Sequence, residues 1–290
     1  MKTIESHKVP ELAAPVRLSD YAVGIFKKLS TRKGIKKAIS KGLIKVNDKR
    51  GTTGKFITGG ETIELLQAKD NKPTIKLALD IVFEDDYLAI INKPAGMVVS
   101  GNQKRTLENA LPTGLKPSSQ IDTLQRPLPV HRLDHATSGL LLIAKTRSVQ
   151  TQLSQLFSDR KIEKTYNAIT IGKIEKQGEI DSKIKEKTAI TKYLLLQSLQ
   201  SEKYGSLNLV ELKPHTGRRH QLRIHMLENG TPILGDRRYF IKGKLSQGKG
   251  LYLCSTALSF MHPATNEMLN TSIELPHKFV KIFGKGSEEE

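Results

Sequence analysis

Cysteine is scarce in this chain, because Cys254 is the only one among 290 residues. A single thiol cannot form an intrachain disulfide, and it excludes a zinc site built from several thiolates. Long apolar runs are also missing, since no stretch approaches the ~20 apolar residues that a membrane-spanning helix needs. The first seven residues lack the apolar core of a secretory signal. We therefore expect a cytoplasmic protein that is not inserted in a membrane.

Acidic side chains are few relative to basic ones. The 29 Asp and Glu residues face 47 Lys and Arg residues, which gives a net charge of +18. A surplus of this size attracts polyanions, so the leading partners are a nucleic acid or an acidic membrane surface. Residues 1–76 hold 17 of the basic and 7 of the acidic side chains, so +10 of the charge lies in about a quarter of the chain.

Four segments follow one another along the chain. Residues 1–14 are polar and contain Pro10, which predicts an extended arm. Residues 15–67 are basic and periodic, and we expect a small basic domain there. The polar, proline-broken stretch 68–78 predicts a linker. Residues 79–285 then form a larger domain.

The small domain is predicted to hold two helices and a small sheet. Apolar residues at three- and four-residue steps predict one amphipathic helix over 18–29. Thr31 can cap a second helix that Gly42 would end. Alternating residues predict strands at 43–47 and 62–66.

Basic residues gather on the second of these helices. They would line one side of it, where they could meet phosphates; they are Arg32, Lys33, Lys36, Lys37 and Lys41. For a lone helix the alternative is a solvated lysine-rich face. The order of elements resembles the small α-L RNA-binding fold named after ribosomal small-subunit protein four, and this resemblance implies RNA contacts.

The larger domain contains many short strand-like runs that do not alternate regularly with helices. Examples are 81–83, 87–93, the fully apolar run 140–144, and the alternating run 207–212. A doubly wound parallel sheet requires regular alternation of strands and helices. We therefore predict an α+β fold with a mixed, largely antiparallel sheet.

Two polar clusters in this domain could carry chemistry. The segment 130–139 crowds charged side chains, Asp134 among them, directly before the apolar run 140–144, and buried charges need partners. The segment 213–225 combines a glycine-containing turn with alternating basic and apolar residues that could hold an anion. Each has a plainer interpretation, a surface turn for the first and a basic surface helix or strand for the second. The spacing of the histidines does not let their side chains converge on one ion, so we expect no metal site.

The first cluster, His-Arg-Leu-Asp at 131–134 followed by Thr-Ser-Gly at 137–139, resembles the signature of RluA-type pseudouridine synthases. The resemblance continues, in the family's order, over about residues 79–284. Its further matches are at 86–96, 163–166, 216–225, 232–236 and 258–263. It implies isomerisation of uridine to pseudouridine in RNA.

The resemblance also implies roles for single residues. Asp134 would be the nucleophile and Arg223 the cation that keeps it ionised, while Tyr166 would stack on the base and could transfer a proton at C5. Leu222 would close the other face of the base. Arg132 would fill the space left by the flipped nucleotide. The remaining substrate-binding candidates are His131, which would support the loop, and Arg218.

The reaction moves no electrons to an acceptor and needs no group donor, so we expect no cofactor. Structured RNA is the expected partner, ribosomal RNA ahead of transfer RNA, with no obligatory protein partner and a monomeric state. Thr231, Phe240 and Arg219 depart from the family pattern, which bears on RNA contacts more than on chemistry. The alternatives are an RNA-binding assembly factor without activity and a metal-dependent hydrolase acting on RNA.

Overall fold

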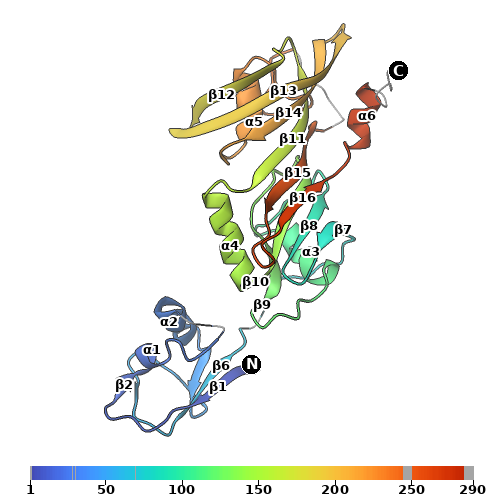
Figure 1. The fold of residues 1–290 in the computed structure, drawn as a ribbon. Coiled ribbons are helices and arrows are strands. Elements are labelled where there is room, and N and C mark those ends of the chain that lie inside the picture. Colours follow the sequence, from blue (N-terminus) through green and yellow to red (C-terminus); the bar gives the residue numbers. More distant parts are fainter. Residues whose placement is uncertain (1, 28, 30, 69, 244–249, 284–290) are drawn as a thin grey trace. The chain divides into compact units, whose positions relative to one another are not determined.

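The computed structural model describes residues 2–27, 29, 31–68, 70–243 and 250–283. The chain divides into two compact units, Met1–Lys72 and Pro73–Glu290 (Figure 1). The division falls inside the predicted linker, 68–78. Each unit has a hydrophobic core of its own.

The first unit is built on a four-stranded sheet with the order β1-β6-β3-β4. Its elements are β1 (Thr3–Lys8), β2 (Val16–Arg17), α1 (Leu18–Tyr21), α2 (Arg32–Ser40), β3 (Ile44–Val46), β4 (Lys49–Arg50), β5 (Phe56–Ile57) and β6 (Thr62–Leu66). Helix α2 begins where the sequence predicts, because the Thr31 hydroxyl accepts a hydrogen bond from the Gly34 N–H at 3.2 Å. It buries Ile35, Ala38 and Ile39 against the sheet side of the unit.

Two predictions for this unit are wrong. Residues 3–8 are strand β1, paired antiparallel with β6, and not part of an extended arm. Ile4 packs against the core of the unit, so burial of apolar surface holds the segment in the sheet. The helix predicted over 18–29 stops at Tyr21, and Gly24 lies in a left-handed turn with φ +80°. Ile25 and Leu29 still pack on the core, from turns and not from a helix.

The second unit contains a ten-stranded sheet that runs β12-β13-β14-β11-β15-β10-β8-β7, with β16 beside β15 and β9 beside β10. Every pairing is antiparallel except that of β10 with β15. This confirms the mixed, largely antiparallel sheet. The strands are β7 (Asp80–Glu84), β8 (Leu88–Lys93), β9 (Thr123–Pro129), β10 (Ser138–Thr146), β11 (Glu163–Ile171), β12 (Gln177–Ile184), β13 (Lys187–Ser201), β14 (Gly205–Pro214), β15 (Leu253–Met261) and β16 (Met268–Ser272).

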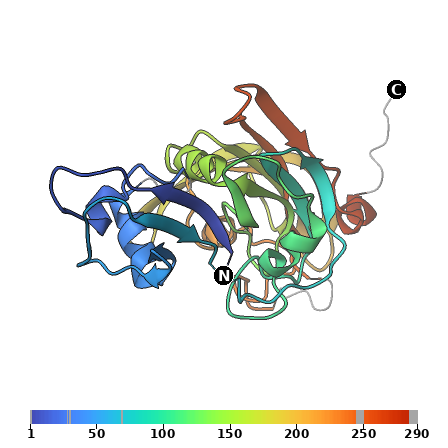
Figure 2. The same ribbon diagram turned by 90° about the horizontal axis from the view of Figure 1, so that it is seen from below.

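Helices cover both faces of this sheet (Figures 1 and 2). They are α3 (Leu107–Gly114), α4 (Arg147–Ser158), α5 (Gln221–Glu228) and α6 (His277–Phe283). Alternate residues of β8 point to opposite faces, so Ile91 meets the core that α3 and α5 share, while Ile90 meets the core under α4. Alternation therefore sorts the side chains of one apolar strand into two cores.

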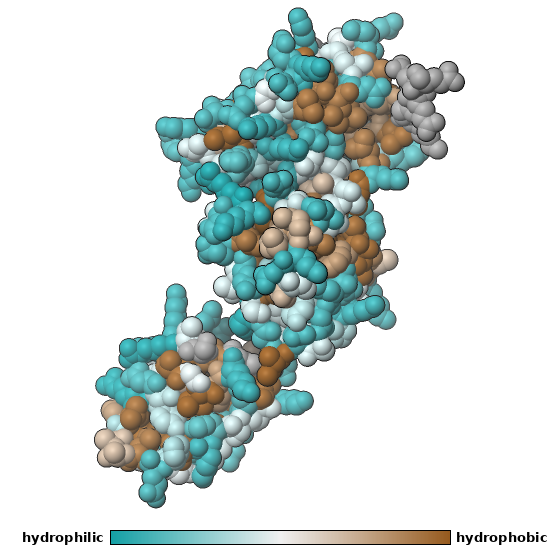
Figure 3. Space-filling model, in the orientation of Figure 1, coloured by the Kyte–Doolittle hydropathy of each residue, from teal (hydrophilic) through white to brown (hydrophobic). Residues whose placement is uncertain are grey.

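On the face that Figure 3 shows, hydrophilic side chains cover much of the second unit and apolar areas lie among them. Within the described residues, no helix combines the length and the apolar character needed to cross a membrane.

Candidate active site

Asp134 lies in the loop between β9 and β10, a fifth exposed. The Thr137 N–H donates to the Asp134 backbone oxygen at 3.1 Å, which closes a tight turn. The next residue is held from outside the loop, because the Gly96 N–H donates to the His135 carbonyl at 2.8 Å. The chain then enters β10 through Gly139 at φ +109°, where a Cβ would lie 2.2 Å from the Ser255 carbonyl oxygen. The loop geometry therefore requires glycine at this position.

Arg223, from the first turn of α5, joins two carboxylates. Its Nη1 donates to Asp134 Oδ2 at 3.2 Å, and its Nε and Nη2 donate to Asp236 Oδ2 and Oδ1 at 2.6 and 2.8 Å. A guanidinium can make this double contact because its donors lie in one rigid plane. Arg223 thus brings together the two polar clusters of the sequence, 130–139 and 213–225.

Asp236 is the fixed end of this arrangement, with 2% of its surface exposed. Its Oδ1 also accepts from the backbone N–H groups of Arg238 and Tyr239, at 2.9 and 3.0 Å. Burial by itself would raise the pKa of Asp236, but the hydrogen bonds from Arg223 and from these two N–H groups lower it below its usual value. Asp236 therefore stays ionised and holds Arg223 in place.

His220 and Tyr239 close a ring of contacts around Asp134. The Nε2 of His220 is 3.6 Å from Asp134 Oδ1, and its Nδ1 is 2.9 Å from the Tyr239 hydroxyl. The Tyr239 ring in turn lies under the Arg223 guanidinium, 5.0 Å from its centre. His220 adopts a left-handed backbone with φ 59°, which is uncommon outside glycine and is found at functional sites. Burial and the neighbouring arginines lower the pKa of His220 although Asp134 opposes this.

Tyr166 and Leu222 are buried in the same hydrophobic cluster, which also contains Leu133 beside Asp134. Tyr166 lies on β11, and Leu222 precedes Arg223 on α5. Burial raises the pKa of the Tyr166 hydroxyl to about 12, and the Asp134 carboxylate adds to this effect. The Tyr166 hydroxyl is therefore protonated near neutral pH.

Lys93 is a buried cation that the sequence does not single out as a site residue. It ends β8, is 0% exposed, and its Nζ donates to the carbonyls of Pro94 and Met97 at 2.9 Å each. Burial lowers the pKa of Lys93 to about 8, while the Asp134 carboxylate acts in the opposite direction. Lys93 therefore contributes positive charge on the β8 side of Asp134.

The other predicted substrate-binding residues have different surroundings. His131 accepts a hydrogen bond from the Leu142 N–H at Nε2 and stacks near Phe157, and burial lowers its pKa to about 3. The His131 ring is therefore neutral, and its hydrogen bond joins the loop to β10. Arg132 is exposed. Arg218 donates from Nε to the Thr188 carbonyl at 3.0 Å, which ties the turn before α5 to β13.

The predicted RNA-binding residues all lie on the exposed side of α2 or directly after it. One of them, Arg32, forms an ion pair with Asp20 at 2.7 Å, in which the Arg32 side chain is exposed and the Asp20 side chain half-buried. The others leave their charge available to a ligand; they are Lys33, Lys36, Lys37 and Lys41.

A metal centre has no basis within the described part of the chain, since no three His, Cys, Asp or Glu side chains there are placed to hold an ion.

The sequence did not mark His220, Tyr239 and Asp236 as site residues. Asp236 ends the matched segment 232–236 and His220 lies within 216–225, so both were visible as parts of motifs. Tyr239 carried no signal of its own. Its place at the site depends on the turn that Asp236 builds through backbone contacts.

This geometry places a carboxylate beside a buried, partly apolar wall. Arg223 donates to Asp134 and leaves the carboxylate a fifth exposed. Tyr166 and Leu222 supply flat and aliphatic surface next to it. The arrangement leaves room for a planar ring against the apolar wall, with the Asp134 carboxylate at its edge.

Comparisons with known proteins bear on which reaction this is. The family profile described as RNA pseudouridylate synthase matches residues 87–228, which include Asp134, Tyr166 and Arg223. The chain is 34% identical to an uncharacterized RNA pseudouridine synthase of Aquifex aeolicus, covering 87% of this chain and 88% of that protein.

Relatives named for a ribosomal substrate match over similar lengths. The chain is 31% identical to ribosomal large subunit pseudouridine synthase D of Haemophilus influenzae, over 92% of this chain and 90% of that one. It is 33% identical to ribosomal large subunit pseudouridine synthase C of Rickettsia felis, over 92% and 95%.

Among solved structures, human RNA Pseudouridylate Synthase Domain Containing 4 matches with a TM-score of 0.55 and 28% identity, over 69% of this chain and 90% of that one. Sequence and fold agree, and the chain belongs to the RluA family of RNA pseudouridine synthases, which are isomerases.

Proposed function

We propose that this enzyme isomerises uridines of large-subunit ribosomal RNA, with Asp134 as its nucleophile. The observation that carries the assignment of Asp134 is its contact with Arg223, which Asp236 holds from the other side. Ribosomal RNA is supported by relatives that are named for the large ribosomal subunit and match over at least nine-tenths of their length.

The reaction breaks the bond between N1 of uracil and C1′ of ribose, then joins C5 to the same C1′. The proton on C5 leaves and N1 gains one, so no atom is lost. Asp134 would either add to C1′ or remove a proton from C2′, and in both routes Arg223 would stay in contact with its carboxylate.

The base must turn between these two bonds without leaving the site. Tyr166 would stack on it from β11, and Leu222 would close the opposite side from α5. As the C5 proton passes to the Tyr166 oxygen, the hydroxyl would hand its own proton on toward N1, which gains one in the reaction. A target uridine in a stem or loop has to be extruded first, and the exposed Arg132 would occupy the vacated space.

RNA docking would be shared with the first unit. We propose that its basic helix α2 contacts the phosphate backbone through Lys33, Lys36, Lys37 and Lys41, in an RNA-binding module like that of ribosomal small-subunit protein four. Arg218 would contact RNA near the catalytic loop, and His131 would keep that loop in shape. A monomer without cofactor or obligatory protein partner is sufficient for this scheme.

The test compares the wild type with Asp134→Asn on an unmodified large-subunit rRNA transcript. Pseudouridine is detected by carbodiimide labelling, and RNA affinity by filter binding. We expect kcat to fall at least about 1,000-fold in the variant, while Kd changes by less than about twofold, because Asn keeps the size of the side chain.

Transfer RNA is the second arm of this test. Activity on transfer RNA with none on the ribosomal transcript would overturn the substrate assignment and leave Asp134 in place. A fully active Asp134→Asn enzyme would overturn the nucleophile.

A further inference from the structure

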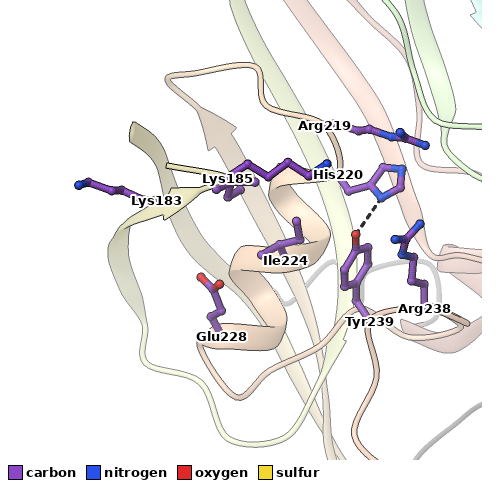
Figure 4. Close-up of a pocket in the computed structure, with 9 residues that line it drawn as sticks. Lys183, Lys185, Arg219, His220, Ile224, Glu228, Arg238 and Tyr239 are labelled. Carbon is purple, nitrogen blue, oxygen red and sulfur yellow. Dashed lines mark hydrogen bonds between the residues drawn. The ribbon is translucent and has the colours of Figure 1, made fainter. Parts of the chain in front are cut away.

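A pocket of about 240 Å³ opens beside the ring of contacts around Asp134 (Figure 4). It lies between the β12–β13 hairpin, helix α5 and the turn after Asp236. Tyr239 and Ile224 supply apolar surface to its lining.

The rim of this pocket is strongly basic. Lys185, Arg219 and Arg238 surround the His220 ring in Figure 4, and Lys183 stands further out on the hairpin. All four cations are exposed, and none forms an ion pair with a carboxylate of the described residues. Glu228 is the one acid among the lining residues, and its Oε2 accepts from the Ser182 hydroxyl at 2.7 Å.

The elements that carry these cations are fastened to one another. The Ser182–Glu228 hydrogen bond joins β12 to the end of α5. At the other end of the helix, Gln221 Nε2 donates to the Ile190 carbonyl on β13 at 2.9 Å. The hairpin tip itself turns tightly, with Lys185 and Glu186 both in left-handed conformation. The cations therefore project from fixed backbone, which reduces the cost of ordering them around a ligand.

The pocket is separated from the nucleophile by one side chain. His220 and Tyr239 line it, and His220 Nε2 lies 3.6 Å from Asp134 Oδ1 on its other side. In a nucleotide, only the ribose separates C1′ from the flanking phosphates. An RNA whose uridine C1′ is at Asp134 therefore brings a backbone phosphate to this neighbourhood.

We propose that this pocket binds the backbone phosphate next to the target uridine. Lys185, Arg219 and Arg238 would hold the anion, and Lys183 would meet the phosphate further along the strand. The inference rests on the proposed function, because the catalysed position in RNA fixes which phosphate arrives here. Phosphate contacts of this kind set register and orientation without reading the base.

The test replaces two cations that point toward His220, in the double variant Lys185→Ala/Arg219→Ala. The matched control is Lys187→Ala/Arg237→Ala, which removes one exposed lysine and one exposed arginine adjacent in sequence to lining residues but outside the pocket. RNA affinity is measured by filter binding of the large-subunit transcript over a series of salt concentrations.

We expect Kd to rise about tenfold in the pocket variant and the slope of log Kd against log salt to fall by about one to two, since each lost phosphate contact removes close to one unit. The value of kcat/KM should fall by the same factor. The control should stay within about twofold of the wild type, and the charge-keeping variant Lys185→Arg/Arg219→Lys should recover most of the lost affinity.

Equal losses in the pocket variant and the control would overturn the proposal, because they would show a general effect of charge. An unchanged Kd in the pocket variant would overturn it as well. A wild type that forms no pseudouridine in this RNA would instead contradict the proposed function, and the binding comparison distinguishes the two failures because it needs no turnover.

Discussion

At the scale of single residues, the site depends on one guanidinium shared by two carboxylates. Asp236 is buried and receives two donors of Arg223, whereas Asp134 receives one at the longer distance of 3.2 Å. The stronger contact fixes the arginine, and the weaker one leaves the Asp134 carboxylate only partly occupied by donors. Arg223 thus acts as a positioned counter-charge, while Asp236 determines where that charge stands.

Tyr166 allows a prediction about pH. Burial raises the pKa of its hydroxyl to about 12, so the proton stays on through the whole range in which an ordinary tyrosine, with a pKa of about 10, begins to lose it. We expect Tyr166→Phe to lower kcat by about 100-fold if the hydroxyl transfers a proton. The ratio of wild-type to variant kcat should then stay constant from about pH 7 to about pH 10.

The measurement is a pair of kcat profiles on the same RNA, with Tyr204→Phe as a control that removes a half-buried hydroxyl from the turn between β13 and β14. A ratio that rises with pH would mean that the ionised phenolate is the active form. A ratio near one at every pH would limit Tyr166 to stacking.

At the scale of elements, the close contact between β10 and β15 brings the loop that carries Asp134 to the centre of the sheet. This is the parallel pairing, and it places Gly139 opposite Ser255. A Cβ there would be 2.2 Å from a backbone oxygen, at a φ of +109° that side chains rarely adopt. We expect Gly139→Ala to destabilise the second unit by more than about 2 kcal/mol, because neither the backbone nor the neighbour can move aside cheaply.

Thermal unfolding followed by circular dichroism measures this effect. Gly217→Ala is the matched control, since a Cβ at that position meets no atom within 4 Å. Equal unfolding temperatures for the two variants would contradict the strain argument.

The sequence predicted elements best where local signals were complete. Helix α2 has both a capping threonine and an apolar stripe, and β10 is a continuous apolar run, so each was placed correctly. The segment 18–29 has the apolar spacing of a helix, but Gly24 breaks it and its side chains reach the core from turns. Strand β1 was missed because it is short and polar, and its pairing with β6 crosses more than fifty residues.

The same limit applies to the site. Asp134 and Arg223 lie 89 residues apart, and only motifs already known to act together connected them in advance. The approach of His220 and Tyr239 to Asp134 could not be predicted, because it depends on a left-handed residue and on a turn closed by backbone N–H groups. Such geometry leaves little trace in composition or periodicity.

At the scale of the whole molecule, much of the net positive charge lies in the first unit, whereas the candidate active site lies in the second. The first unit holds about a quarter of the residues and 16 Lys and Arg against 7 Asp and Glu, while Asp134, Tyr166, Arg223 and Asp236 all belong to the second unit. Each unit has its own core. Binding energy for RNA and the chemistry of the reaction should therefore be separable by cutting the chain at the boundary after Lys72.

We expect the fragment 73–290 to fold and to keep its kcat at saturating RNA within about threefold of the full chain, because every group around Asp134 is retained. Its Kd for large-subunit rRNA should rise by about 10- to 1,000-fold at physiological salt, with a smaller salt slope, because the phosphate contacts of α2 are lost. Circular dichroism checks the fold, filter binding gives Kd and its slope, and carbodiimide labelling gives kcat.

A full-length variant with Lys33, Lys36, Lys37 and Lys41 replaced by Ala serves as the control for deletion, and it should reproduce most of the loss in affinity. If the fragment binds as tightly as the full chain, the first unit does not dock the RNA; if it binds weakly but the lysine variant binds normally, the unit meets RNA through another surface.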